Sequence, residues 1–223
     1  MSTTFRLPTH ALATAWLNTF TSTGDDPDRP ALYRTISAEF YGASAVRLIA
    51  TDSYMLTIAW CASDGEPEPD LSEAPDHSLV VMDTEQRGKG LMSYLWTATK
   101  KDMLHETDLR IVNGEEPSTP SLSDDLARKA LIVDTELERL TLPILQGEYP
   151  GWRSLLSAWS PKGTERVALA PDLLGRFAKF KHAGPVRFSL NGDTGGVRWE
   201  MVPGPELMMA HGLLMPVREG ADA

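Results

Sequence analysis

The order strand–helix–three strands recurs along this 223-residue chain and constrains its fold more than any single motif does. Residue patterning indicates three copies of this module, near residues 5–61, 77–150 and 164–218. A module of this kind covers half a sheet with one helix and cannot bury its apolar face alone. Each module must therefore pack against another module.

Apolar periodicity and turn residues predict the elements within each module. The first module is expected to place its strand, helix and three strands at Phe5–Pro8, His10–Ser22, Tyr33–Tyr41, Ala45–Thr51 and Tyr54–Cys61. In the second module they are expected at His77–Met82, Gly90–Leu104, Leu109–Val112, Ala130–Asp134 and Arg139–Leu145. A linker at Tyr149–Lys162 leads to the third module, expected at Arg166–Ala170, Pro171–Lys181, Val186–Leu190, Gly196–Val202 and His211–Val217.

Composition excludes several classes of protein. No apolar run approaches the ~18–20 residues that span a bilayer, so we expect a cytoplasmic protein with no membrane segment. The net charge of −10 argues against a protein that coats nucleic acid with its whole surface, although a ring with a basic lining remains compatible with it. Acidic residues concentrate in Asp64–Asp76 and Glu115–Asp125, which we interpret as solvated loops.

Metal and covalent chemistry find little support in the sequence. The five histidines are scattered without the spacing of metal ligands, and no G-x-S-x-G nucleophile motif is present. The only cysteine, Cys61, lies in an apolar stretch typical of a core. We therefore expect no catalytic residues, no cofactor and no metal.

Three separated stretches carry most of the functional information. Residues 48–56 read LIATDSYML, residues 147–153 read GEYPGWR, and residues 213–218 read LLMPVR. In this order they resemble the bacterial DNA polymerase III beta sliding clamp family, whose corresponding segments read like VATDGHRLA, GxFPDYRRVLP and VVMPMRL. The resemblance implies an α+β sliding-clamp (DNA clamp) fold of repeated β-α-β-β-β modules, with helices lining the inside and antiparallel sheets outside. Residues 1–150 resemble the complete middle domain of that clamp, and 151–223 resemble the second half of its last domain.

In that family the three stretches form one hydrophobic pocket that holds short peptides from the DNA polymerase, the clamp loader and other partners. By matching motif, the resemblance implies a peptide-binding set of Thr51, Ser53, Tyr54, Met55, Leu56, Pro150, Ser154, Leu155, Leu213, Met215, Pro216, Val217 and Arg218. Met55 and Met215 would supply deformable walls. Tyr54-Met55 replaces His-Arg of the family pattern, and Ser154 replaces Arg, so a different or weaker partner motif is expected. The alternative is that these residues are only strand core and linker packing.

Clamps of this family also line their hole with basic helices that contact double-stranded DNA through phosphates without reading sequence. The resemblance and helical spacing imply a DNA-facing set of Arg87, Lys89, Lys100, Lys101, Arg176, Lys179 and Lys181. The first helix contains no Lys or Arg, which weakens its contribution. A solvated helix face with no DNA contact remains the alternative.

The sequence leaves three functions open. The favoured one is a non-enzymatic DNA sliding clamp, or polymerase processivity factor. A second is a clamp-like decoy that occupies host replication proteins without encircling DNA. A third is an N-acetyltransferase, because Arg87–Met92 reads RGKGLM and resembles the pyrophosphate loop of the acetyl-CoA-dependent superfamily.

Module counting predicts a closed ring of several chains. Rings of the clamp family contain twelve such modules, so three per chain favour a homotetramer, while a trimer or dimer remains possible. Open sheet edges would otherwise stay exposed. One arrangement combines two C-terminal halves from neighbouring chains into a composite domain. Since cellular bacterial clamps have three full domains, a bacteriophage origin is a further hypothesis.

Overall fold

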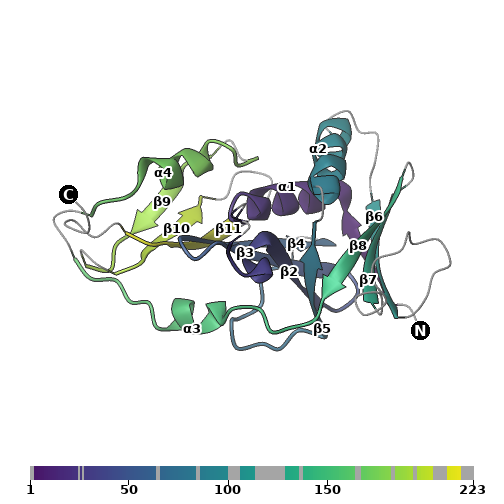
Figure 1. Ribbon diagram of the computed structural model, residues 1–223, viewed down its shortest axis with the longest axis horizontal. Helices are drawn as coiled ribbons and strands as arrows, with labels where there is room; N and C mark the ends of the chain where they lie inside the picture. Colours follow the sequence, from purple (N-terminus) through teal and green to yellow (C-terminus); the bar gives the residue numbers. More distant parts are fainter. Residues whose placement is uncertain are drawn as a thin grey trace.

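A computed structural model describes residues 3–24, 26, 28–63, 66–83, 86–99, 106–113, 129–135, 138–163, 167–181, 184–192, 195–202 and 210–216 (Figure 1). Its helices are α1 (Thr9–Phe20), α2 (Arg87–Thr99), α3 (Trp152–Ser157) and α4 (Pro171–Phe177), with a short 3-10 turn at Ala31–Arg34. Its strands are β1 (Thr3–Pro8), β2 (Thr35–Tyr41), β3 (Ala45–Thr51), β4 (Met55–Ala62), β5 (His77–Met82), β6 (Glu106–Asn113), β7 (Lys129–Asp134), β8 (Arg139–Leu145), β9 (Val186–Ser189), β10 (Val197–Met201) and β11 (Ala210–Leu214).

The strands form one antiparallel sheet in the order β1-β6-β7-β8-β5-β2-β3-β4-β11-β10-β9. The first two modules exchange their first strands within it. β1 pairs with β6 of the second module, and β5 pairs with β2 of the first. In both pairs the last residue of the first strand faces the first residue of the other strand: Pro8 faces Glu106, and Met82 faces Thr35. Neither module could separate without losing a strand.

Helices α1, α2 and α4 lie on one side of the sheet, which we call the helix face, and α3 lies on the opposite face (Figure 1). α1 packs against α2 and is buried along most of its length. This burial explains why α1 carries no Lys or Arg, because an unpaired charge there would lose its hydration. Because it is buried and carries no Lys or Arg, α1 contributes little to any basic surface on the helix face, as the sequence predicts.

The third module extends the sheet of the first, because β11 pairs with β4. Gly212 makes this close pairing possible. A Cβ atom there would lie 1.8 Å from the carbonyl oxygen of Leu56, which also accepts a 3.3 Å hydrogen bond from the indole nitrogen of Trp199. Two phenylalanines of the third module, Phe177 and Phe180, pack on the Trp199 ring from the helix face.

Three sequence expectations differ from the structure. Residues 167–170 do not form a strand, although a strand was expected at Arg166–Ala170. The helix expected at Pro171–Lys181 ends at Phe177, and residues 178–181 form turns. The linker expected at Tyr149–Lys162 contains helix α3, whose Trp152 and Leu156 are buried. Glu115–Asp125 lies outside the described residues.

The acidic segment Asp64–Asp76 is not merely a solvated loop. Residues 66–76, here called the strap, lie against the face opposite the helices through backbone carbonyls that accept hydrogen bonds. Trp60 donates to the Glu66 carbonyl at 2.7 Å, and Arg47 donates to the Pro69 carbonyl at 2.5 Å. The Glu68 carboxylate is almost buried and lies 2.7 Å from Arg47. Composition alone predicts a solvated loop, because it does not show that the Glu68 carboxylate pairs with the buried Arg47.

Glu68 also contacts His211 of β11 at 3.0 Å. Burial by itself raises the pKa of Glu68, but the His211 hydrogen bond and the Arg47 guanidinium together hold this pKa below its usual value. A carboxyl group with a lowered folded-state pKa stabilises the fold above its unfolded pKa, and this stability is lost as pH falls through the folded pKa.

We therefore predict that Glu68→Gln lowers the free energy of unfolding at neutral pH by about 1–3 kcal/mol, the usual result of leaving a buried donor poorly paired. The difference from the unaltered chain should narrow as pH falls from about 5 to 3, where the carboxylate protonates. Urea unfolding across that pH range measures both. A difference that stays constant with pH would contradict this role of Glu68.

Candidate partner-binding surface

The three stretches singled out by sequence meet on one face of the sheet. β11 runs beside β4, with Leu213 opposite Leu56. Beyond the strands, the Met215 amide donates a 2.9 Å hydrogen bond to the Tyr54 carbonyl. The Thr51 amide donates to the Tyr149 hydroxyl at 3.0 Å, which ties the segment before α3 to the end of β3. Residues from all three stretches are thus held together by hydrogen bonds, two strands through their backbones and Tyr149 through its side-chain hydroxyl.

A small apolar cluster, separate from the main core, lies beneath this meeting point. Its buried members are Ile49, Leu56, Ile58, Trp152, Leu156 and Leu213, and Leu71, Tyr149 and Trp159 pack against them. The cluster draws on β3, β4, α3 and β11, because alternate residues of each strand point to the same face. It gives the surface an apolar floor.

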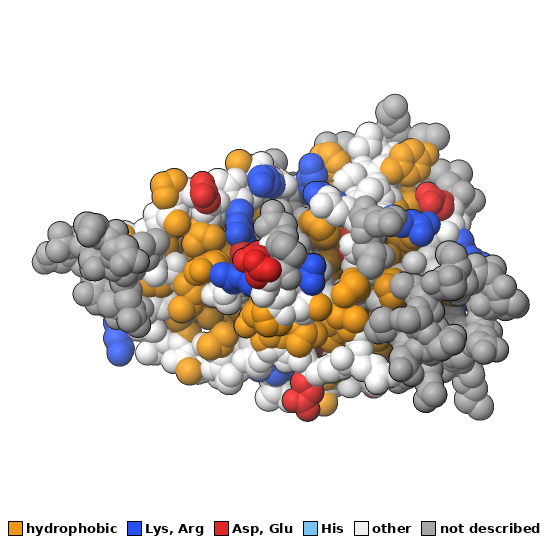
Figure 2. Space-filling view, viewed as in Figure 1, with side chains coloured by type: hydrophobic (Ala, Val, Ile, Leu, Met, Phe, Trp, Pro, Cys, Tyr) orange, Lys and Arg blue, Asp and Glu red, His pale blue; other side chains and the backbone are white. Residues whose placement is uncertain are grey.

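Large apolar side chains stand exposed on the segments that meet here. Tyr54 is 50% exposed, Leu155 60% and Met215 48%. We call these three residues, with Leu56, Leu156 and Leu213 beneath them, the convergence surface. Figure 2 shows hydrophobic side chains gathered between α3 and α4 in this view. Exposed apolar groups above an apolar floor are typical of a surface that binds another chain.

Other members of the expected peptide-binding set are placed differently. Thr51, Pro150 and Pro216 are partly buried, and Ser53 and Ser154 are exposed. Met55 is fully buried in the main core and cannot form a wall of this surface. The reason is strand alternation, since Met55 and Leu56 point to opposite faces of β4. Val217 and Arg218 lie outside the described residues.

The β3–β4 turn that carries Tyr54 is fixed by Asp52. One carboxylate oxygen accepts the amides of Tyr54 at 3.0 Å and Met55 at 2.9 Å. The other oxygen forms a 2.6 Å ion pair with Arg176 of α4. Ser53 adopts a positive φ of 75°, a conformation that this hydrogen bonding holds in place. The turn is therefore rigid and joined to the third module.

Arg29, which sequence reasoning missed, lies beside this turn. Its guanidinium donates to the Asp52 carbonyl at 2.5 Å and the Ser53 hydroxyl at 2.7 Å. It also lies 4.6 Å from the centre of the Tyr54 ring. This places a positive charge at the convergence surface, where the sequence had indicated the loss of basic groups. No local signal marked Arg29, because it comes from the loop between α1 and β2.

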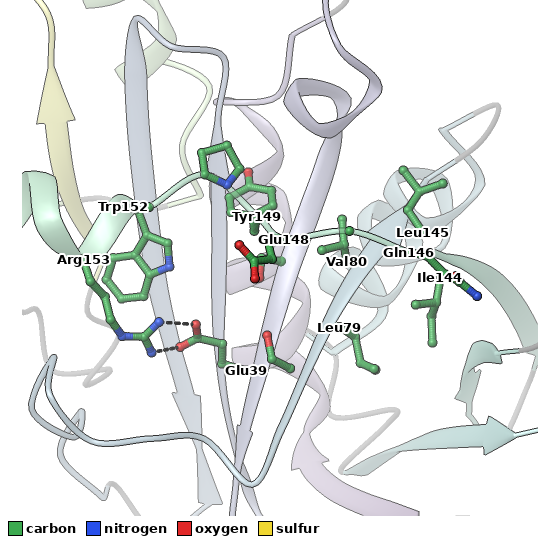
Figure 3. A pocket seen from close by; sticks show the side chains of 15 residues that line it. Glu39, Leu79, Val80, Ile144, Leu145, Gln146, Glu148, Tyr149, Trp152 and Arg153 are labelled. Carbon is green, nitrogen blue, oxygen red and sulfur yellow. Dashed lines mark hydrogen bonds and ion pairs between the residues drawn. The ribbon is translucent and has the colours of Figure 1, made fainter.

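A separate cavity of about 640 Å³ lies beside this surface, beneath the segment that leads into α3 (Figure 3). Arg153 pairs with both carboxylate oxygens of Glu39 there, at 2.7 and 2.5 Å. Of the residues expected to bind a peptide, only Pro150 lines this cavity. The cavity and the convergence surface are thus different features on one face of the sheet.

The expected DNA-facing residues lie on or after α2 and α4, the helices of the helix face. Arg87 and Lys179 are exposed. The Lys89 ammonium lies 4.8 Å from the centre of the Phe20 ring, and the Lys181 ammonium lies 4.8 Å from that of Trp96. Arg176 is engaged by Asp52. Lys100 and Lys101 lie outside the described residues.

Two amides at the start of α2 that a phosphate would need are already engaged by a carboxylate. The Asp83 carboxylate accepts the backbone amides of Gly88 at 2.6 Å and Lys89 at 2.7 Å. Burial raises the pKa of this carboxyl group, although those two amides act in the opposite direction. An acetyl-CoA pyrophosphate would have to displace Asp83, so this loop does not support the acetyltransferase alternative.

Two further kinds of feature are absent from the described residues. No group of three or more His, Cys, Asp or Glu side chains there is arranged to hold a metal ion. Within the same part of the chain, no helix is long and apolar enough to cross a membrane.

Solved structures with the same fold are bacterial sliding clamps. The clamp (DNA polymerase III subunit beta) of Pseudomonas aeruginosa bound to griselimycin gives a TM-score of 0.61 at 14% identity. A putative DNA polymerase III beta subunit from Eubacterium rectale gives 0.63 at 11%, and the beta chain from Streptococcus pneumoniae gives 0.61 at 15%. These matches cover 96%, 96% and 98% of this chain, and 65% of each of the other chains. No protein-family model and no curated protein matches the sequence.

The chain therefore has the α+β fold of a sliding clamp, with a large antiparallel sheet that carries α1, α2 and α4 on one face. It spans 65% of the length of these clamps. The sequence expectation for the fold class is confirmed.

We predict that Asp52→Ala lowers the free energy of unfolding by about 3 kcal/mol, because it leaves Arg176 and two turn amides without their acceptor. Asp52→Asn should cost less, since its side-chain oxygen can still accept the turn amides while the ion pair is lost. Urea unfolding of the two variants gives the comparison. If both variants lost the same free energy of unfolding, the turn hydrogen bonds would contribute nothing to stability.

Proposed function

We propose that this protein is a non-enzymatic, clamp-like processivity factor that binds peptides of replication proteins at the convergence surface and holds them on DNA. The observation that carries the proposal is the meeting of three distant stretches under exposed Tyr54, Leu155 and Met215. An apolar surface with a few polar anchors suits a short peptide with a Gln, a Leu and a terminal aromatic residue. Arg29 adds a positive charge that favours an acidic group or free carboxylate on the partner.

DNA would be held by enclosure. Arg87 and Lys179 are exposed on the helix face, and Lys89 and Lys181 rest on aromatic rings with their charges available. Such groups would contact phosphates without reading bases, so affinity should be low and should fall with salt. The chain has three modules, and we propose that copies of it close into a ring, with a homotetramer favoured by module counting.

The peptide site is tested by fluorescence anisotropy with a labelled peptide that contains a Gln, a Leu and a C-terminal aromatic residue. Combined Leu155→Ala and Met215→Ala substitutions should weaken binding about tenfold, because central apolar contacts dominate such interfaces. Tyr94→Ala is the matched control, since Tyr94 is a comparably exposed aromatic residue on α2. Equal affinity of both variants, or equal binding of a scrambled peptide, would exclude this surface as the site.

Processivity is tested by adding the protein to a bacterial replicative DNA polymerase on a long primed template. A clamp should lengthen the products, and the Leu155→Ala and Met215→Ala variant should lose that effect while Tyr94→Ala keeps it. Shorter products in the presence of the unaltered protein would reject the clamp proposal and favour the decoy.

A further inference from the structure

Among the described residues, the segment before α4 has no strand partner. Val167, Leu169 and Ala170 pack against the main core. Ala170 is extended, with φ −64° and ψ 131°. Among the described residues, no backbone hydrogen bond involves Val167, Ala168 or Leu169. The sequence predicts a strand here, and within the described part of the chain its backbone has no strand partner.

β9, the last strand of the sheet, has an open edge that could receive such a segment. Among the strands that the structure describes, it pairs with β10 on one edge only. Its other edge meets a single isolated bridge beyond the strand, between Lys162 and Asn191. By contrast, the corresponding strands of the other modules are paired on both edges, β6 between β1 and β7 and β2 between β5 and β3. An open edge of this kind is a template for another strand.

The first two modules show which strand fills that position. In each of them the strand before the helix pairs with the second strand of the other module, not of its own. Pro8, which ends β1 directly before α1, has φ −60° and ψ 122°, close to the values at Ala170 before α4. Residues 167–170 are thus shaped as a first strand, and the module that should receive them is absent from the chain.

We propose that a second copy of this chain supplies it. Residues 167–170 of each copy add to β9 of the other, and the two C-terminal modules form one composite clamp domain about a twofold axis. The exchange is reciprocal, as an isologous contact requires, and it adds a strand to an open edge. This deepens the ring assembly proposed above by naming the surface at which two chains join.

The internal pairs also fix the register. In both, the residue that ends the first strand faces the residue that begins the second. Applied to the C-terminal module, this rule places Ala170 opposite Val186 of the other copy, and Val167 opposite Ser189 of the other copy. A shift of one residue would turn the buried side chains to the wrong face.

Exposed apolar residues lie beside this edge, where the second module would cover them. Phe188 of β9 is 41% exposed, and Leu174 of α4 is also exposed. α4 buries only Leu173 of its residues, whereas α1, which has α2 beside it, is buried along most of its length. The lower burial of α4 is expected for a helix that has no partner helix packed beside it.

Disulfide trapping tests the register directly. Chains carrying Val167→Cys are mixed with chains carrying Ser189→Cys and oxidised, and a covalent dimer is expected on a non-reducing gel. Two cysteines at directly opposed strand positions are close enough to form a disulfide. Two cysteines offset by two residues are too far apart. Val167→Cys mixed with Arg187→Cys is therefore the matched control and should give little dimer. Cys61 is buried, which raises the pKa of its thiol to about 12 and keeps it from competing.

Sedimentation of the full chain supplies a second test. The unaltered protein should associate in the micromolar range, and Phe188→Glu should weaken that association about tenfold or more. Tyr94→Glu is the control, because Tyr94 is as exposed but lies on α2. Circular dichroism confirms that both variants fold. A strict monomer, equal effects of the two variants, or equal trapping by the control cysteines would overturn the proposal.

These results are separable from those for the proposed function. Trapping and sedimentation need neither DNA nor polymerase, so a composite domain could form in a protein that fails to stimulate synthesis. Conversely, the protein could stimulate DNA synthesis while its cysteine variants at positions 167 and 189 fail to cross-link. That result would support the clamp function and reject this contact.

Discussion

The exchange of first strands between modules is the constraint on which the rest of the structure depends. β1 completes the sheet of the second module and β5 completes that of the first. The exchange holds α1 and α2 side by side and lets α1 be buried along most of its length. It also leaves β4 free to pair with β11, which brings the C-terminal stretch to the β3–β4 turn. The convergence surface exists because of this pairing.

A network of buried charged residues, on the side of the sheet opposite the helix face, positions the α3 part of the convergence surface. Glu39 and Arg47 lie on neighbouring strands, and Arg153 pairs with Glu39 through two hydrogen bonds. Arg153 precedes the exposed part of α3, so this pair fixes the helix that carries Leu155. Glu68 joins the strap to the same network. Buried ion pairs contribute little net stability on average, but removing one partner is costly, so they favour one arrangement over others.

Much of the fold follows from sequence patterning. β3, β5 and β8 begin and end where apolar alternation predicted, and the other strands differ by a few residues. The fold class followed from the resemblance of three short stretches. The site followed in part: the stretches do meet, yet Met55 points into the core, and Arg29 and the Arg176–Asp52 pair carried no sequence signal. Peptide binding and DNA contact stay predictions.

The sequence by itself determined the local structure, because apolar periodicity and turn residues act within a few residues of one another. It also determined which segments were unusual. Only the tertiary structure decided which strand pairs with which, that residues 167–170 have no strand partner among the described residues, and that the acidic strap is held against the sheet. These outcomes depend on groups brought together from distant positions, whose pairing is decided by burial and hydrogen bonding in the folded chain.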